Sequence, residues 1–229
     1  MIPLLDDNPA KLRPVVTIVL IVTCVAIFLW EESLGQASDS AMLLLGLTPN
    51  AFTHPGEAFG IPAWLTLVTF MFLHAGWMHV IGNMLYLWIF GNNIEDAMGH
   101  GKFTLFYFAC GIIAGLTMIL VDPNSHTPVV GASGAISGVL ASYMLLYPRA
   151  RVRVWLVVWP VWIRAVWVVG VWFVLQLLNA VLTPASEPGT AWWAHVGGFA
   201  AGLLLTPLLK SSAVPYFGPV EPRGPWANG

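Results

Sequence analysis

Six apolar segments, each close to the length needed to cross a lipid bilayer, constrain this chain more than any other feature. Hydrophobic residues make up 58% of its 229 residues and charged residues only 9%, whereas about 25% charged residues are usual in a soluble domain. A bilayer-crossing helix needs roughly 20 predominantly apolar residues. The predicted spans are 14–30, 77–90, 103–121, 131–147, 165–182 and 191–209, and the fourth of them is short because it ends before Pro148. The sequence therefore predicts an all-α, multi-pass membrane protein.

The remaining segments complete the predicted organisation. Residues 1–13 form a polar N-terminal segment, 14–210 a single six-span domain, and 211–229, rich in Pro and Gly, a flexible tail. We expect a long polar loop over 31–60 and an interfacial piece before the second span. The first apolar segment has no small-residue cleavage site, which predicts that it is retained as a span.

One apolar stretch, residues 154–163, is too short to be a span. It is interrupted by Pro160 and carries Trp155, Trp159 and Trp162. Tryptophan is enriched at membrane–water interfaces. We therefore predict that this stretch lies on the membrane surface, and counting it as a seventh span would disturb the charge distribution described next.

The basic residues fall on one side of the predicted topology. The loops 31–60, 122–130 and 183–190 contain no Lys or Arg, and all nine basic residues lie in the other connections and the termini. They are Lys11, Arg13, Lys102, Arg149, Arg151, Arg153, Arg164, Lys210 and Arg223. By the positive-inside rule, both termini are predicted to be cytoplasmic. We expect a multi-pass protein of the inner (cytoplasmic) membrane.

Polar side chains recur near the starts of the even-numbered spans. These spans run from the outside inward, so Ser133, His195 and His79 are expected at one depth, slightly below the outer surface. Polar groups at membrane depth are costly and are therefore candidates for function. Histidine is the usual base for activating a serine hydroxyl. Spans four, five and six contain no Asp or Glu, which favours a Ser-His dyad over a triad.

Stabilisation of an oxyanion is also available at this depth. Ser133 begins a predicted helix, where unpaired backbone N–H groups and the positive end of the helix dipole face the site. Asn83 follows His79 by four residues, so the two side chains project from one helix face. Donors aimed at a developing negative charge would form an oxyanion hole.

Small residues give the serine and histidine helices a way to meet. Gly134 and Gly138 form a small-residue face beside Ser133, and Gly198 and Gly202 form another on the face of His195. Such faces allow close helix packing in membranes. Gly131 and Gly134 additionally permit a tight chain entry into the helix.

Three motifs together resemble the rhomboid family of intramembrane serine proteases. Gly131-Ala132-Ser133-Gly134 resembles its GxSG motif, residues 74–83 (HAGWMHVIGN) are similar to its HxxxxHxxxN motif, and residues 194–202 (AHVGGFAAG) are similar to its AHxxGxxxG motif. The resemblance covers roughly residues 10–210 and implies a six-helix rhomboid-like bundle.

The resemblance implies a role for each matching residue. Ser133 would be the nucleophile and His195 the general base, while His79, Asn83 and the backbone N–H of Ser133 would form the oxyanion hole. His74 and the glycines Gly131, Gly134, Gly198 and Gly202 would give structural support. The implied partners are the lipid bilayer and single-span or multi-span membrane protein substrates, cut near the outer membrane face. No metal, cofactor or nucleic acid is implied.

One position departs from the family pattern. Many members carry an aromatic residue four positions after the serine, stacked on the catalytic histidine, and here that residue is Ser137. Another contact, for example with a tryptophan, must then orient His195.

Two other classes of protein stay open at this point. A non-catalytic relative would bind membrane helices without cutting them. A haem or metal protein could use His79 and His195 as ligands, but this leaves the GxSG motif without a purpose. The sequence leaves the substrate, the cleavage-site preference, the pathway and the oligomeric state open.

Overall fold

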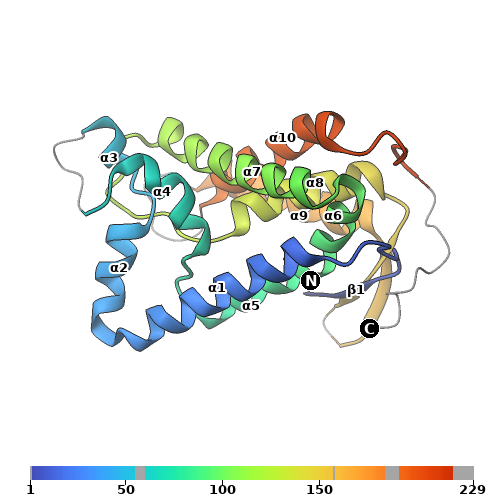
Figure 1. Ribbon diagram of the computed structural model, residues 1–229, viewed down its shortest axis with the longest axis horizontal. Coiled ribbons are helices and arrows are strands. Elements are labelled where there is room, and N and C mark those ends of the chain that lie inside the picture. Colours follow the sequence, from blue (N-terminus) through green and yellow to red (C-terminus); the bar gives the residue numbers. More distant parts are fainter. Residues whose placement is uncertain (1, 55–59, 157, 184–190, 219–229) are drawn as a thin grey trace.

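Long helices lie side by side along the molecule, with a small sheet at one end (Figure 1). The computed structural model describes residues 2–54, 60–156, 158–183 and 191–218. Four helices are individually long and apolar enough to cross a membrane. They are α1 (Val15–Ser33), α7 (His100–Val121), α9 (Ala165–Leu182) and α10 (Trp192–Leu209). Their bounds confirm four of the predicted spans to within a few residues.

The predicted second span is part of a longer, bent unit. A short helix, α4 (Ala63–Thr69) with the 3-10 turn η3 (Phe70–Phe72), meets the helix Trp77–Met98 at an angle of 82°. The latter comprises α5 (Trp77–Tyr86), a π-helical turn η4 (Leu87–Gly91) and α6 (Asn92–Met98). The prediction ended this span at residue 90, because the polar residues of α6 do not read as membrane-buried. If the bent pair is one span, the described residues contain five.

The remaining predicted span is the short central helix α8 (Ser133–Leu146), with 14 residues. Most of its residues, including Ile136, Val139 and Leu140, are buried inside the protein. Since other helices surround it, α8 does not need the length that contact with lipid on both sides would require. The prediction that this segment is short is confirmed.

The predicted loop 31–60 contains helical turns. It holds η1 (Gly35–Ala37), α2 (Ser38–Leu45) and α3 (Asn50–Thr53). Leu47, two residues after α2, pairs with Val129 in an isolated β-bridge, which ties this segment to the chain that leads into α8. The loop prediction failed here because these short helices are held by such non-local contacts.

The two ends of the predicted surface stretch, 154–155 and 160–163, lie in strands of an antiparallel sheet. Strands β1 (Ile2–Asp6), β2 (Arg151–Trp155) and β3 (Pro160–Arg164) pair in the order β1-β2-β3. In β2, Val152 and Val154 are buried while the alternate residues are exposed, the period of two that marks a strand. The stretch is too short to span, as predicted, but the N-terminal segment expected to be merely polar supplies its third strand.

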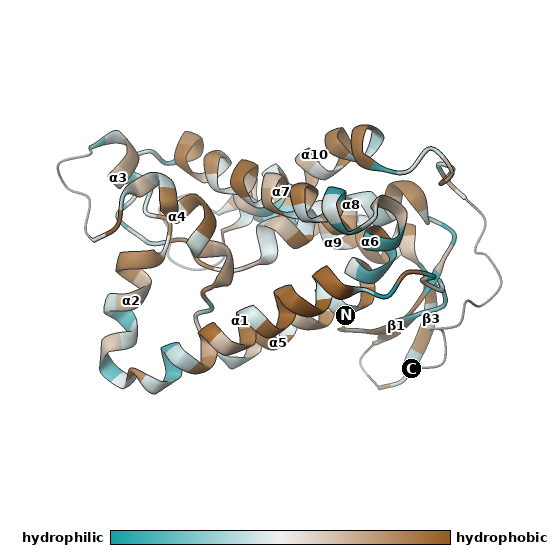
Figure 2. Cartoon of the chain, in the orientation of Figure 1, coloured by the Kyte–Doolittle hydropathy of each residue, from teal (hydrophilic) through white to brown (hydrophobic). Residues whose placement is uncertain are grey.

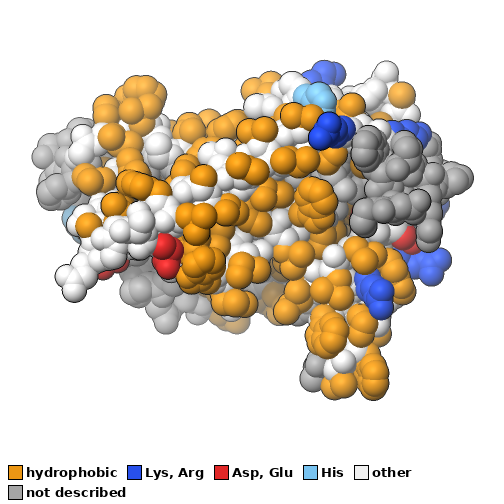
Figure 3. Space-filling view, turned by 60° about the horizontal axis from the view of Figure 1, so that its bottom comes forward, with side chains coloured by type: hydrophobic (Ala, Val, Ile, Leu, Met, Phe, Trp, Pro, Cys, Tyr) orange, Lys and Arg blue, Asp and Glu red, His pale blue; other side chains and the backbone are white. Residues whose placement is uncertain are grey.

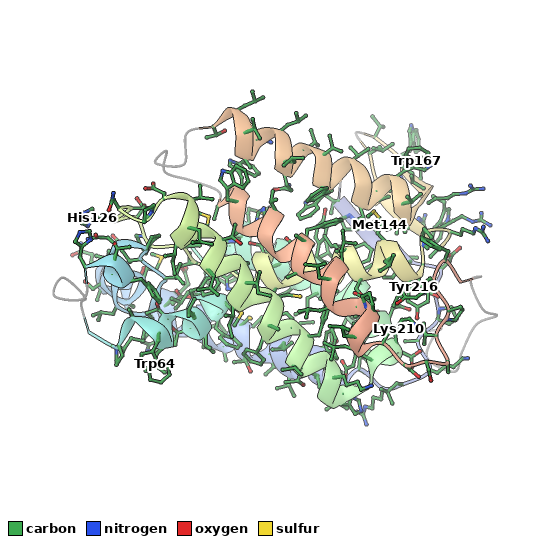
Figure 4. The ribbon with its side chains drawn as sticks, turned by 90° about the horizontal axis from the view of Figure 1, so that it is seen from above. Trp64, His126, Met144, Trp167, Lys210 and Tyr216 are labelled. Carbon is green, nitrogen blue, oxygen red and sulfur yellow. The ribbon has the colours of Figure 1, made fainter. Side chains whose placement is uncertain are left out.

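The two ends of the bundle differ in character. Trp64 and His126 lie at one end, and Trp167, Lys210 and Tyr216 lie at the other (Figure 4). In the face shown in Figure 3, the Lys and Arg side chains gather toward the end that carries the sheet, and apolar side chains cover the middle. Figure 2 shows the same apolar character along α1, α7 and α9. Large apolar side chains such as Leu120 of α7, Leu182 of α9 and Leu204 of α10 are exposed, as expected of helices long and apolar enough to cross a membrane.

Part of the predicted tail packs on the bundle. The backbone N–H of Ser211 donates to the Ala97 carbonyl, that of Phe217 donates to the Leu145 carbonyl, and the Lys210 ammonium lies over the Tyr216 ring. Residues 211–218 are therefore held against α6 and α8. Residues 219–229 lie outside the described residues.

Candidate active site

Ser133 and His195 meet although they are 62 residues apart in the chain. Ser133 is the first residue of α8 and His195 lies in the first turn of α10. The Ser133 Oγ and the His195 Nε2 are 2.8 Å apart, a hydrogen bond. The structure thus brings the predicted nucleophile and base into the distance that proton transfer between them requires.

Close backbone packing produces this meeting. A Cβ at Gly198 would collide with the Gly134 carbonyl, and one at Gly202 with the Gly138 carbonyl. The two predicted glycine faces therefore pack directly on one another. Because the obstacle on each side is backbone rather than a flexible side chain, a larger residue would force α8 and α10 apart.

The second ring nitrogen of His195 contacts a residue that the sequence interpretation missed. Gln176 on α9 is buried, and its Oε1 lies 2.7 Å from the His195 Nδ1. An amide oxygen only accepts hydrogen bonds, so this contact places the proton on Nδ1 and leaves Nε2 free to accept the Ser133 hydroxyl. A glutamine within an apolar span was the available signal, because buried polar groups in membranes have partners.

Two tryptophans flank the same imidazole. The ring of Trp172 lies 5.8 Å from that of His195 at an interplanar angle of 37°, and the ring of Trp192 lies 6.2 Å away, nearly perpendicular at 86°. Ser137, at the position where an aromatic residue is common, instead donates its hydroxyl to the Ser133 carbonyl. The ring is thus bounded by α9 and by its own helix.

His79 and Asn83 approach the chain just before Ser133. Gly131 has φ +122°, and a Cβ there would lie 2.7 Å from the His79 Nε2 and 3.7 Å from the Asn83 Nδ2. Only glycine fits this position, both by its backbone conformation and by the space available. The N–H of Gly131 donates to the Phe70 carbonyl, which holds the turn into α8.

The polar atoms of these two residues are set as donors. The Ala75 N–H lies 3.4 Å from the His79 Nδ1 as its donor, so the proton of a neutral imidazole resides on Nε2, which faces Gly131. The Asn83 Nδ2 is buried and has no hydrogen-bond partner among the described residues. Because an unsatisfied buried donor is costly, we expect the Asn83 Nδ2 to donate to an acceptor on a molecule bound in the cavity.

His74 supports this arrangement from behind. It is buried, its Nδ1 lies 3.2 Å from the Phe72 carbonyl oxygen, and its backbone N–H donates to the Glu31 carboxylate. Its ring packs edge-on against that of His79, with 5.2 Å between the centroids. The contacts are those of a residue that fixes the position of His79.

A cavity of about 760 Å³ joins these groups. Its lining includes Ser133, His195, His79 and Asn83. Apolar side chains such as Met78, Met118 and Trp172 supply much of the remaining wall. A mainly apolar cavity with a few convergent polar groups is the usual form of a substrate site.

The fold and site define a multi-pass helical membrane protein with a serine–histidine pair inside the bundle. The Rhomboid domain profile matches residues 62–212, and the chain therefore belongs to the rhomboid family.

Several known rhomboid proteins are similar to this chain. It is 31% identical to Rhomboid-like protein 11, chloroplastic, of Arabidopsis thaliana over 159 residues, 65% of this chain and 54% of that protein. It is 35% identical to Rhomboid protease GluP of Bacillus subtilis over 120 residues, 52% of this chain and 22% of the relative. It is 29% identical to Rhomboid protein 1, mitochondrial, of Saccharomyces cerevisiae over 149 residues, 61% and 40% of the two chains. The matches thus span about a fifth to just over a half of these relatives' lengths.

Proposed function

We propose that this protein is an intramembrane serine endopeptidase that hydrolyses a peptide bond of membrane-spanning protein substrates. The observation that carries the proposal is the 2.8 Å contact between the Ser133 Oγ and the His195 Nε2, both of which line the cavity. One similar protein bears the name of a rhomboid protease. Others are named rhomboid-like, so catalysis in this chain is a proposal to be tested.

The proposed reaction begins with attack by the serine. The Ser133 Oγ forms a bond to the substrate carbonyl carbon as its proton passes to the His195 Nε2. The negative charge on the former carbonyl oxygen is met by the His79 Nε2–H, the Asn83 Nδ2–H and the backbone N–H of Ser133. The C–N bond then breaks, and the leaving amine takes the proton from Nε2. Water, activated by the same Nε2, hydrolyses the acyl-enzyme.

Gln176 completes the proposed dyad by holding His195 in the correct tautomer. With the proton on Nδ1, Nε2 has a lone pair directed at the hydroxyl. In many serine proteases a carboxylate performs this task. In this chain a neutral amide would do so, which avoids placing a charge inside the membrane.

The proposal includes an orientation of the protein in the membrane. The four long apolar helices, the bent pair and the short helix α8, together with the clustering of Lys and Arg toward the end with the sheet (Figure 3), support a count of six spans, with α8 as the fourth, and cytoplasmic termini. Ser133 would then lie toward the outer face of a bacterial inner membrane. Relatives named as chloroplastic or mitochondrial leave other membranes as alternatives.

Cleavage of a model membrane-spanning substrate in proteoliposomes tests the proposal. Ser133→Ala is expected to abolish both cleavage and labelling by a fluorophosphonate probe, while the protein keeps its helical circular dichroism. Ser142→Ala is the matched control on the same helix, because the Ser142 hydroxyl is buried and makes no hydrogen bond among the described residues. Cleavage that persists in Ser133→Ala would overturn the assignment. A wild type that is neither labelled nor active would indicate a non-catalytic, helix-binding relative.

A further inference from the structure

The three-stranded sheet presents one exposed face that carries both arginine and large apolar side chains. Arg151 pairs with Arg164 across β2 and β3, and Arg153 pairs with Trp162. Directly paired residues project from the same face. On the other edge of β2, Leu5 of β1 pairs with Arg153 and Ile2 pairs with Trp155. All seven side chains are exposed.

The apolar part of this face is large. Trp155 is 47% exposed, Trp162 45% and Trp159, near the turn between the strands, 74%. Ile2, Leu5 and Val158 are exposed as well. Contiguous apolar patches on a protein surface mark sites of interaction, and nothing in the described part of the chain covers this one.

The cationic part is largely free of acidic neighbours. Arg151 lies 3.6 Å from the Asp7 carboxylate. For Arg153 and Arg164, the described residues provide no carboxylate within salt-bridge distance. An arginine guanidinium forms two parallel hydrogen bonds to a phosphate, which makes it suited to phosphodiester headgroups.

The position of the sheet relates this face to the bilayer. Arg164 is followed directly by α9, a helix apolar enough to span a membrane. Trp167, in the first turn of α9, is 65% exposed, as expected of a tryptophan at a membrane interface. In Figure 1 the strands β2 and β3 project crosswise to the long helices from this end of the bundle. Because the sheet lies next to the end of a membrane-spanning helix and projects across the helix direction, it extends along the membrane surface rather than away from it.

We propose that the exposed face of the sheet binds anionic phospholipids at the surface of the bilayer. Its tryptophans lie among the headgroups, where an amphipathic ring is stable, and Arg153 and Arg164 bind headgroup phosphates. Anionic lipids attract basic segments next to a membrane span. This inference needs only that the chain spans a membrane and is independent of whether it is a protease.

Site-directed spin labelling of the full chain in proteoliposomes tests the proposal. Val158→Cys places a label near the turn of the sheet, and Ser212→Cys is the control, exposed in the segment after α10. The native Cys24 and Cys110 are fully buried and stay unlabelled. Each label is measured in vesicles of phosphatidylcholine alone and with phosphatidylglycerol. Its accessibility to lipid-soluble oxygen is compared with that to a water-soluble nickel complex.

The proposal expects the label at 158 to be several-fold more accessible to oxygen than the label at 212. This preference should increase with phosphatidylglycerol, and Arg153→Gln with Arg164→Gln should remove that increase. Preferential nickel access at 158 in both lipids would overturn the proposal. So would an oxygen preference unaffected by anionic lipid, which would leave only apolar insertion. Shielding at 158 seen in native membranes but absent in proteoliposomes would assign the face to a protein partner instead.

Discussion

The two helices that approach His195 do so in different ways. α8 meets α10 backbone to backbone, through Gly134, Gly138, Gly198 and Gly202. α9 meets α10 through side chains, by a stack of Phe173 on Phe199 with centroids 3.9 Å apart and by the Gln176 hydrogen bond. Most of the remaining surface of α9 is exposed, including Val174, Leu178 and Leu182, where lipid would cover it.

This difference separates two requirements of the site. The distance between the serine and the histidine is fixed by backbone contacts, which cannot adapt. The orientation of the imidazole depends on a helix held by side chains, which can rearrange at lower cost. Substitutions at the contact between α8 and α10 should therefore change the distance between Ser133 and His195, whereas substitutions at the contact between α9 and α10 should change the orientation of the imidazole.

Among variants that leave both Ser133 and His195 in place, the largest effect is expected from Gly198→Ala. The new methyl group would meet the Gly134 carbonyl, and overpacking of this kind costs about 1–3 kcal/mol. Displacement of reacting groups by about 1 Å lowers rates on the order of 10²-fold. We expect cleavage to fall by at least that factor, measured in proteoliposomes, with a lower unfolding temperature.

Gly170→Ala on α9 is the matched control. A Cβ there meets nothing within 4 Å, and alanine is preferred over glycine in helices by about 1 kcal/mol. The variant should be active and at least as stable as the wild type. Equal activity of the two alanine variants would contradict the view that backbone contact sets the Ser133–His195 distance.

A smaller effect is expected from Gln176→Leu. Without its acceptor, the imidazole loses the preference for the tautomer with the proton on Nδ1, and kcat should fall about 10–100-fold, part of the contribution usual for general base catalysis. KM should change little, because Gln176 contacts His195 rather than the substrate.

Two comparison variants distinguish positioning from mere packing. Gln176→Glu retains an acceptor for Nδ1 and should recover part of kcat. Asn179→Leu alters the next turn of α9, where the side chain only donates to the Leu175 carbonyl, and should leave kcat unchanged. If Gln176→Glu is as impaired as Gln176→Leu, the tautomer explanation fails.

The smallest effect concerns the end of α8 opposite Ser133. There the Tyr143 hydroxyl and the Asn93 amide donate to the Asp6 carboxyl group of β1. Burial raises the pKa of Asp6 from 3.8 to about 7, although the hydrogen bond from Tyr143 opposes the shift. The folded protein thus binds a proton that the unfolded chain releases above about pH 4, so the contribution of Asp6 to stability is greatest below that pH and is lost as the pH rises to about 7.

Thermal unfolding in detergent measures this dependence. Between pH 5 and pH 8 the wild-type Tm should decrease by roughly a few degrees, whereas Asp6→Asn should show a flatter profile. Activity at a fixed pH should differ little between the two proteins, because Asp6 contacts Tyr143, which lies near the end of α8 away from Ser133. A wild-type Tm that rises over this range would contradict the assigned direction.

The fold could be predicted where the signal is local. Hydropathy located α9 at its observed bounds and α1, α7 and α10 to within a few residues, because each of these helices must satisfy its own backbone inside lipid. The helices within residues 31–60 and the sheet could not be predicted from the sequence. Their short elements form through contacts such as Leu47 with Val129 and β1 with β2, which join distant segments.

By itself, the sequence determined that this chain crosses a membrane several times, and it singled out Ser133, His195, His79 and Asn83 as polar residues within apolar segments. Polarity is expensive in lipid, so these residues are visible without a structure. Only the tertiary structure decided what holds His195. The His195 ring is contacted by side chains from two helices, Gln176 and Trp172 of α9 and Trp192 of α10. Their spacing along the chain does not predict that they converge on one ring. The helix faces that meet, and hence the environment of the imidazole, follow from packing.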